Sequence, residues 1–412
     1  MTDDITLRSP APDGLRDWVQ PLFDAFSEEF SELQFASGEP LHDATRLINA
    51  FDGERRIGSA GSFAFRLTVP GGEVGASGIT AVGVNPDQRR RGVLRRMMTW
   101  LLDDARAHGE PVAVLWASEG AIYQRFGFGF GTLQAGFEVD RSRLVFRSPL
   151  PHDERVRMRM VDADEALGLI PPIYEAVRRT TPGSVDRTEL KWRNHVLADA
   201  DWMRGSDGPK YRALLEVDGE PRGFVIYRVH GDWDARGPRA SVLVMELFDL
   251  DPDAEQRLWQ WVASMDLVST IKLRRGPVPH PLLSWVAEPR RLGLTLSDAL
   301  WLRIVDLPAA LAARTYVGEG TLVFEVTDDQ IDTNAGRWKL SVPPQGPASV
   351  TPTTAQPDLT LDVAALACTY LGAVRFADLA AAGRVREGRP GALLTADALF
   401  TPSITPFCNT MF

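Results

Sequence analysis

Residues 79–100 read ITAVGVNPDQRRRGVLRRMMTW and divide into an apolar strand, a polar turn and an amphipathic helix. Apolar side chains recur at helical spacing from Val93 onward, which predicts a helix with one face packed on a sheet. The members of that face are Val93, Leu94, Met97, Met98, Leu101, Leu102 and Ala105. The stretch therefore predicts a strand–turn–helix unit, and the rest of the chain is placed around it.

The turn of this unit carries Arg89, Arg90, Arg91 and Gly92. The first N–H groups of a helix have no backbone partner, and the helix dipole makes that end positive. Together with arginine side chains, these groups predict a site for an anion, most naturally a pyrophosphate. A solvated surface cluster or a nucleic-acid patch is the alternative.

The bulk composition limits that alternative and several others. A formal charge of −10 makes the chain a poor binder of polyanions, so we expect no nucleic-acid partner. A P-loop is excluded because no Gly-Lys-Ser/Thr follows the turn. A Rossmann site is excluded because the turn lacks a second glycine and the chain lacks an early βαβ start.

The length and the remaining residue types predict a multidomain globular chain. A chain of 412 residues has room for about two to three domains. No apolar stretch approaches the roughly 18 residues of a membrane span, and the acidic N-terminus is unlike a signal peptide. We therefore expect a cytoplasmic protein, with secretion by a signal-less route left open. The two cysteines and six histidines show no metal-binding pattern, so no metal is predicted.

A second stretch, residues 115–128, reads LWASEGAIYQRFGF. The run from Arg89 to Gly92 fits the (Gln/Arg)-x-x-Gly-x-(Gly/Ala) loop of the GNAT acetyltransferases, although Leu94 stands where the pattern has Gly or Ala. Together, the two stretches resemble one branch of these enzymes, the Eis (enhanced intracellular survival) acetyltransferases.

The resemblance implies acetyl-CoA as cosubstrate. Its pyrophosphate would lie on Arg89, Arg90, Arg91, Gly92, Val93, Leu94 and Arg95. GNAT enzymes splay two strands at a bulge before this loop, and the pantetheine arm pairs with the exposed backbone. Val82, Gly83 and Val84 occupy that place, and Gly83 suits a bulge. By family position, Ser118 and Glu119 contact the CoA arm.

Two catalytic groups are also implied by the resemblance. Tyr123 stands where GNAT enzymes keep a general acid for the leaving thiolate, and the alternative is a tyrosine of the core. In Eis enzymes the terminal carboxylate is the general base, which here is that of Phe412. An α-carboxylate has a reference pKa of about 3.3–3.7, so partial burial would help it accept a proton. The alternative for this apolar chain end is simple docking in the core.

The predicted helix at residues 15–30 offers an acceptor site. Asp24, Phe26, Glu28 and Glu29 could form the acidic, aromatic-rimmed wall of a pocket for an amine, or an ordinary solvated helix face. The acidic chain favours a cationic acceptor. The family implies aminoglycosides and exposed lysine amines, acetylated by direct attack in a ternary complex.

Three domains are predicted along the chain: 1–148 as the catalytic GNAT domain, 149–298 as a degenerate copy, and 299–412 as a sterol-carrier-like domain. Asp251-Pro252-Asp253 aligns with Asn85-Pro86-Asp87, so that strand end, Pro and helix start coincide. Glu255, Gln256, Arg257 and Leu258 then replace the three arginines and the glycine. A pyrophosphate would meet a carboxylate there, so the second copy is predicted not to bind CoA. Chance similarity of two strand–helix units is the alternative.

The predicted fold class is therefore mixed α+β, with two tandem GNAT domains followed by a sterol-carrier-like domain. The resemblance also implies a homo-oligomer, namely a hexamer. Two other functions stay open at this stage. One is a non-catalytic CoA- or lipid-binding regulator, and the other is a GNAT enzyme specific for one protein lysine.

Overall fold

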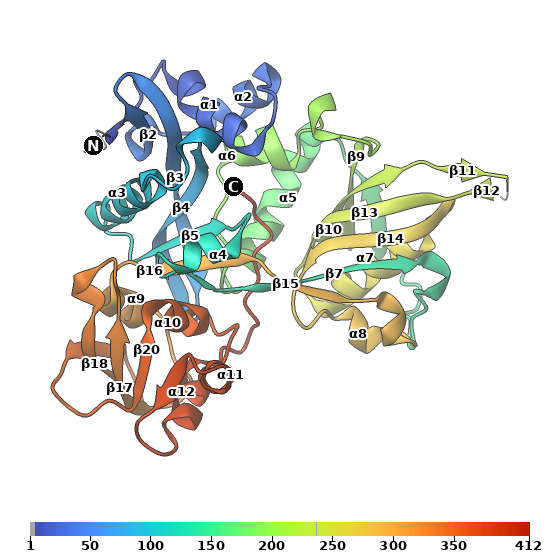
Figure 1. Ribbon diagram of the computed structural model, residues 1–412. Coiled ribbons are helices and arrows are strands. Elements are labelled where there is room, and N and C mark those ends of the chain that lie inside the picture. Colours follow the sequence, from blue (N-terminus) through green and yellow to red (C-terminus); the bar gives the residue numbers. More distant parts are fainter. Residues whose placement is uncertain (1–4, 236) are drawn as a thin grey trace. The chain divides into compact units, whose positions relative to one another are not determined.

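The computed structural model describes residues 5–235 and 237–412, which form two compact units. Of the described residues, the first unit comprises 5–132, 299–406 and 410–412, and the second comprises 133–235, 237–298 and 407–409. The first unit contains a seven-stranded and a five-stranded sheet, and the second contains another seven-stranded sheet (Figure 1).

The first sheet has the strand order β1-β2-β3-β4-β5-β16-β6. Its strands are β1 (Ile5–Arg8), β2 (Leu47–Asp52), β3 (Arg55–Val69), β4 (Gly72–Val84), β5 (Val112–Trp116), β16 (Leu300–Ile304) and β6 (Gly129–Phe130). The helices beside it are α1 (Leu15–Phe26), α2 (Glu32–Gly38), α3 (Val93–Ala107) and α4 (Gly120–Gln124). The predicted helix at 15–30 thus ends four residues early, at Phe26.

The two faces of the first sheet are covered by different helices. Successive strand residues point to opposite faces, so Leu47 and Ile48 enter separate apolar clusters. Ile48 packs with the α3 residues that the helical spacing singled out, including Met97 and Leu101. Leu47 packs with α1 through Trp18 and Phe23. The strand–turn–helix unit therefore forms as predicted, with its apolar face on the sheet.

The second sheet repeats this order as β8-β9-β10-β13-β14-β7-β15. Its strands are β8 (Val156–Met160), β9 (Lys210–Val217), β10 (Glu220–His230), β13 (Ala240–Asp249), β14 (Val268–Gly276), β7 (Leu133–Asp140) and β15 (Thr295–Asp298). A small hairpin joins β11 (Trp233–Asp234) to β12 (Gly237–Pro238). The helices are α5 (Ala163–Arg178), α6 (Glu189–Lys191), α7 (Pro252–Ser264) and α8 (Leu282–Trp285). α5 and α7 pack on separate clusters of this sheet.

One strand of each sheet comes from the other half of the sequence. β7 directly follows β6 along the chain but pairs with β14 and β15 in the second sheet. β16 follows β15 but pairs with β5 and β6 in the first sheet. The predicted contiguous ranges 1–148 and 299–412 therefore misassign these two strands. The pattern of a strand indicates which of its residues are buried and not which strand it pairs with, so it cannot reveal such an exchange.

The third sheet has the order β19-β18-β17-β20-β21. Its strands are β19 (Ser349–Pro352), β18 (Gly336–Val342), β17 (Gly320–Thr327), β20 (Leu359–Asp362) and β21 (Val385–Glu387), with helices α9 (Leu307–Ala313), α10 (Val363–Tyr370), α11 (Phe376–Ala381) and α12 (Ala392–Phe400). A buried ion pair joins it to β16, since both Asp328 carboxylate oxygens accept from Arg303 Nη2, at 2.7 and 2.8 Å. This sheet with its helices agrees with the mixed α+β class predicted for the last domain.

Candidate active site

The first sheet opens between two parallel strands. β4 and β5 pair only at Ala76–Val112, Ser77–Ala113 and Gly78–Val114. Beyond Gly78, β4 continues to Val84 without a further register partner on β5 in the described chain. We call this point, after Gly78 and Val114, the first fork. Unpaired strand backbone of this kind can accept an extended ligand as an added strand.

A bulge redirects β4 just beyond the first fork. Ala81 and Val82 together lie opposite Ala60, and Ala81 has a left-handed φ of 52°. The bulge therefore precedes Gly83, which the sequence had suggested as its residue. Gly83 has another reason to lack a side chain, because a Cβ there would lie 2.8 Å from Leu22 Cα of α1.

The loop after β4 ends at a helix terminus without a side-chain cap. It runs through a short 3-10 turn at Pro86–Gln88, a left-handed Arg90 (φ 65°) and a left-handed Gly92 (φ 81°) before α3 begins at Val93. The N-cap residue of α3, Gly92, has no side chain to accept from the first-turn N–H groups, so within the described part of the chain these groups lack a cap of the usual kind. These donors and the positive end of the helix dipole are thus available to an anion.

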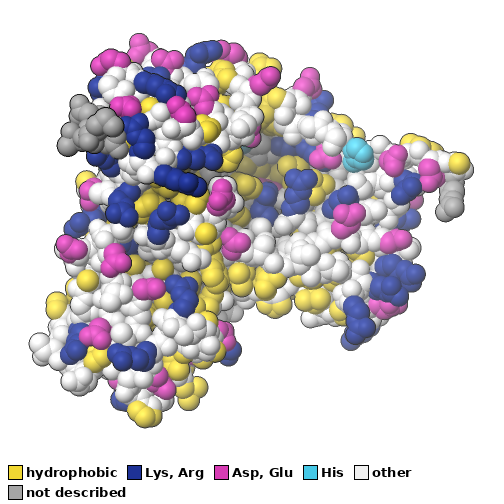
Figure 2. All heavy atoms as spheres, in the orientation of Figure 1, with side chains coloured by type: hydrophobic (Ala, Val, Ile, Leu, Met, Phe, Trp, Pro, Cys, Tyr) yellow, Lys and Arg dark blue, Asp and Glu magenta, His cyan; other side chains and the backbone are white. Residues whose placement is uncertain are grey.

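The arginines of this loop divide into two pairs. Arg91 donates to Asp52 at 2.7 Å and to Gln88, and Arg89 donates to the Ala25 carbonyl at 3.4 Å, so these two tie the loop to its surroundings. Arg90 and Arg95 are exposed and have no ion-pair partner among the residues that the structure describes. Basic side chains gather on the face of the first unit that carries α3 (Figure 2).

Tyr123 lies on α4, a short helix that follows β5. Its side chain is 8% exposed and its ring lies 6.0 Å from that of Phe128. Burial and the neighbouring Glu119 carboxylate raise the pKa of this phenol, which is therefore protonated at neutral pH. Ser118 and Glu119 are exposed at the start of the helix. Tyr123 thus belongs to the core cluster and at the same time carries a proton that it could donate.

The chain terminus lies at the first fork. The Phe412 ring packs against Phe65 at a centroid distance of 4.8 Å, and a Cβ on Gly78 would lie 3.4 Å from its Cε2 atom. Two residues earlier, the Thr410 carbonyl accepts from Trp116 Nε1 at the end of β5, at 2.8 Å. The last residue is therefore held where β4 and β5 separate.

The predicted acceptor residues lie at the end of α1 and just beyond it. Asp24, Phe26, Glu28 and Glu29 are all exposed, with Phe26 at 49%. Exposure of this kind suits both a pocket wall and a solvated helix face.

An aromatic group near Phe412 was missed by the sequence reasoning. The His42 ring stacks on Phe63 at 4.9 Å and meets Trp18 edge-on at 5.0 Å. Phe63 in turn lies 6.5 Å from Phe412. The available signal was the Phe-Ala-Phe alternation of β3, which places Phe63 and Phe65 on one face.

The corresponding junction in the second sheet is built differently. β13 ends at Asp249 and α7 begins at Pro252, so the long loop of the first sheet is missing. The predicted coincidence of helix starts is wrong, and Glu255 to Leu258 lie inside the helix. Asp251 caps α7 by accepting from the Ala254 N–H at 2.9 Å, and it pairs with Arg222 at 2.8 Å. A carboxylate of the protein thus occupies the position of an anionic ligand.

Two further carboxyl groups lie at this junction. Burial and the Asp251 charge raise the pKa of Asp249 to about 7, while burial and the Asp249 charge raise that of Glu255 to about 8. Burial is the larger cause of both shifts, and the charge of the neighbouring carboxylate adds to it.

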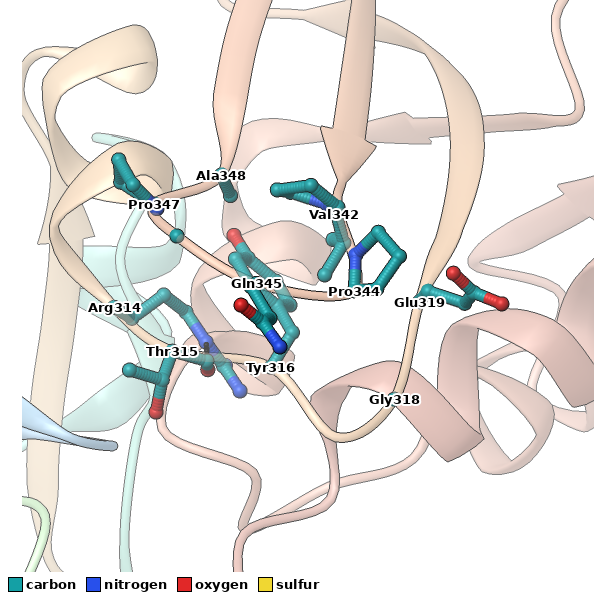
Figure 3. Close-up of a pocket in the computed structure, with 12 residues that line it drawn as sticks. Arg314, Thr315, Tyr316, Gly318, Glu319, Val342, Pro344, Gln345, Pro347 and Ala348 are labelled. Carbon is teal, nitrogen blue, oxygen red and sulfur yellow. Dashed lines mark hydrogen bonds between the residues drawn. The ribbon is translucent and has the colours of Figure 1, made fainter.

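One cavity in the domain of the third sheet is lined by a buried arginine with a structural role. It has a volume of about 470 Å³ and is lined by Arg314, Tyr316 and a proline-rich loop (Figure 3). Arg314 donates to the carbonyls of Thr315, Tyr370 and Phe400, the last two at the ends of α10 and α12. Helix C-termini stabilise a buried cation, so this guanidinium joins two helices. Figure 3 shows the Glu319 carboxylate directed away from it.

The described residues contain no group of three or more His, Cys, Asp or Glu side chains placed to hold a metal ion. Over residues 5–235 and 237–412, no helix has the length and apolar character needed to cross a membrane.

Family models match the chain in three places. Acetyltransferase (GNAT) domain models match residues 6–131 and 183–304, and a sterol carrier protein domain model matches residues 307–409. The fold and the site therefore define a GNAT acetyltransferase with two such domains.

Individual relatives show which family of GNAT acetyltransferases the chain resembles. An uncharacterized N-acetyltransferase of Streptomyces coelicolor is 42% identical over 95% of both chains. The N-acetyltransferase Eis of Mycobacterium tuberculosis is 36% identical over 85% of both chains. The crystal structure of Eis1 from Mycobacterium abscessus matches with a TM-score of 0.83 at 32% identity, covering 99% of this chain and 100% of that one. The chain belongs to the Eis family of N-acetyltransferases and is itself an N-acetyltransferase.

Proposed function

We propose that this enzyme transfers the acetyl group of acetyl-CoA to primary amines of polycationic small molecules such as aminoglycosides. The observation that carries the proposal is the first fork followed by the uncapped N-terminus of α3. The pantetheine arm of acetyl-CoA is extended and carries a pyrophosphate at its far end. It matches both features, because the unpaired backbone of β4 leads directly to the loop and the N-terminus of α3.

The cosubstrate would be held along β4 and its loop. Val82, Gly83 and Val84 orient the pantetheine arm and the thioester beyond the bulge. The pyrophosphate is held by the first-turn N–H groups of Val93, Leu94 and Arg95, with Gly92 allowing its close approach. Arg90 and Arg95 supply charge, while Arg89 and Arg91 hold the loop in place. Ser118 and Glu119 flank the CoA arm.

The chemistry requires two proton movements. The acceptor nitrogen attacks the thioester carbon within a ternary complex, and the carbon–sulfur bond breaks. The amine loses a proton to the Phe412 carboxylate, and the departing thiolate takes one from the Tyr123 phenol. A phenol whose pKa is raised by burial is protonated at neutral pH, as a general acid must be.

The acceptor is proposed to be cationic because the chain is acidic and carboxylates lie at the end of α1 and just beyond it. Asp24, Glu28 and Glu29 would attract a polyamine, with Phe26 supplying an exposed ring. Lysine side chains of proteins carry the same amine and are the second acceptor class.

Three further features stay predictions. The ranges 1–148, 149–298 and 299–412 are proposed as the three domains, except that β7 and β16 each pair in the sheet of another domain. The second domain is proposed not to bind CoA. Assembly as a hexamer and a cytoplasmic location rest on the family resemblance and on sequence features.

The test is thiol release from acetyl-CoA by the purified protein, with and without a multi-amine aminoglycoside, followed by mass spectrometry of the acceptor. Acceptor-dependent release with one or more added acetyl groups supports the proposal. Tight acetyl-CoA binding without release across a panel of amines would favour a regulatory binding protein. Release that requires one protein substrate and is not inhibited by free polyamines would favour a lysine-specific enzyme.

A further inference from the structure

The second sheet contains a fork of its own, and the side chain of Asn409, three residues before the chain terminus, lies in it. β13 and β14 pair from Ala240–Val268 as far as Val244–Leu273, after which β13 continues to Asp249. We call this point, after Val244 and Leu273, the second fork. Met245, the next residue, is a bulge, because Val244 and Glu246 lie opposite the adjacent residues Tyr227 and Ile226.

Asn409 fills the second fork with its side chain. Its Nδ2 atom donates to the Met245 carbonyl at 3.2 Å, and its Oδ1 atom accepts from Arg275 Nε of β14 at 3.0 Å. One amide therefore bonds to both strands at the place where they separate. Asn409 is 6% exposed, so these bonds form away from solvent.

A second segment of the same unit holds the residue two positions earlier. The Phe407 N–H donates to the Pro182 carbonyl at 2.8 Å, and the Phe407 carbonyl accepts from Ser184 Oγ at 3.0 Å. That segment is fixed to β13 in turn, because Arg187 makes two bonds of 2.9 Å to the Glu246 carboxylate. Cys408, between the two anchors, is fully buried.

These contacts make residues 407–409 a tightly held strip of chain. All polar partners just named are buried or half-buried, and both backbone and side-chain groups of the strip are used. Three residues then remain to the C-terminus, and each spans at most about 3.6 Å. Fixing Asn409 thus limits where the Phe412 carboxylate can lie.

We propose that Asn409 is a positioning residue for acetyl transfer: the second acetyltransferase-like domain uses its fork to hold the C-terminal strip and so sets the place of the Phe412 carboxylate. The inference rests on the proposed function, in which that carboxylate is the base. It assigns the second domain a task in the reaction that needs no bound CoA.

The central test compares Asn409→Ala with Ile404→Ala, a control in the exposed part of the same C-terminal segment. A misplaced catalytic group costs up to about 100-fold in rate, so we expect the kcat of Asn409→Ala to fall about 10- to 100-fold. The KM for acetyl-CoA should stay unchanged, since Asn409 belongs to neither the loop nor α3. Ile404→Ala should keep the wild-type kcat.

A second readout follows the strip itself. Carboxypeptidase A removes aromatic C-terminal residues from chains that are released from their fold, so Phe412 should be lost about tenfold faster from Asn409→Ala than from the wild type. Ser184→Ala loosens the strip from its other side and should shift both readouts in the same direction, even if Asn409→Ala folds poorly. Asn409→Asp keeps the acceptor for Arg275 but loses the donor to Met245, so its kcat should lie between those of the wild type and Asn409→Ala.

Two outcomes separate the inference from the function on which it rests. If two glycines added after Phe412 abolish activity while folded Asn409→Ala and Ser184→Ala keep the wild-type kcat, the positioning role is overturned and the base assignment stands. If the extended chain keeps its full kcat, the carboxylate is not the base and both proposals fall.

Discussion

The strand–helix junctions of the two acetyltransferase-like domains begin alike and end differently. In the first domain, β4 leads through a long arginine-rich loop to α3, whose N-terminus has no side-chain cap. In the second, β13 leads almost directly to α7, whose first N–H groups are capped by Asp251. The same helix terminus is thus open to a ligand anion in one copy and satisfied by the protein's own carboxylate in the other.

Under the proposed function, this difference is the way in which the second domain loses an anion site and keeps the fold. A helix needs its first N–H groups satisfied, and a capping carboxylate does this within the chain. Once capped, the terminus repels a pyrophosphate. The two forks also differ in what lies at them. Phe412, the last residue, packs at the point where β4 and β5 separate, whereas the Asn409 side chain fills the second fork.

The largest expected effect comes from removing positive charge at the junction of β4 and α3 in the first domain. Arg90→Ala combined with Arg95→Ala should weaken acetyl-CoA binding about 100-fold or more, since each charge-assisted bond contributes about 1.5–3 kcal/mol. Titration calorimetry measures the dissociation constant. Arg257→Ala, in the first turns of α7, is the matched control and should leave the dissociation constant unchanged. A similar loss of affinity in both variants would contradict the difference proposed between the two domains.

The next effect concerns catalysis at the first domain alone. Tyr123→Phe should lower kcat about 100-fold, because general acid catalysis contributes roughly 10²- to 10⁴-fold. The KM for acetyl-CoA should change little, since the phenyl ring keeps its place in the core. Tyr227→Phe removes a buried phenol from the second sheet and should keep the wild-type kcat. An unchanged kcat in Tyr123→Phe would make this residue part of the core only.

A smaller effect is a pH dependence of stability, caused by carboxyl groups at the junction of β13 and α7 in the second domain. The folded pKa values of Asp249 and Glu255, about 7 and about 8, lie above their ordinary values of 3.8 and 4.5. The folded state therefore keeps protons that the unfolded chain has released, and stability falls as pH rises from about 5 to about 8.

Glu255→Gln should remove part of this dependence. Between pH 5.5 and pH 8.5 we expect the variant to lose on the order of 1–2 kcal/mol less than the wild type. Urea denaturation at both pH values measures the difference. Parallel curves for the two proteins would show that Glu255 is not strained by its burial.

The smallest effect is expected at the cap itself. Asp251→Ala should cost about 1 kcal/mol, or about 2–4 °C in the unfolding temperature, through the lost cap of α7. Acetyl-CoA affinity and kcat should not change, because the long basic loop is still absent. A gain of acetyl-CoA binding in this variant would mean that the cap alone closes the second site.

The sequence predicted the parts of this account that depend on local pattern. The apolar spacing from Val93 predicted α3, and the structure confirms this helix, whereas the anion site at its N-terminus stays a prediction. The repeat was visible because strand, turn and helix recur in the same order. The bulge was expected in the right region, although it falls at Ala81 and Val82 rather than at Gly83.

The parts that depend on long-range contacts were not predictable. The exchange of β7 and β16 could not be predicted from local pattern, because a strand's pattern indicates which residues are buried and not which strand it pairs with. The start of α7 was placed wrongly because Asp251 and Asn85 occupy matching positions in the sequence. Asp251 caps a helix that begins at once, whereas Asn85 is followed by a loop. The contacts of Asn409 join residues more than 130 positions apart, and no periodicity reports such pairs.

The central claim, that one of the two domains binds acetyl-CoA, is tested most directly by the binding stoichiometry. Titration calorimetry of the full chain with acetyl-CoA, at protein concentrations well above the dissociation constant, gives the number of sites per chain. The account predicts one site, which the Arg90→Ala and Arg95→Ala double variant removes. Two sites per chain, or one site that survives in the double variant, would contradict it.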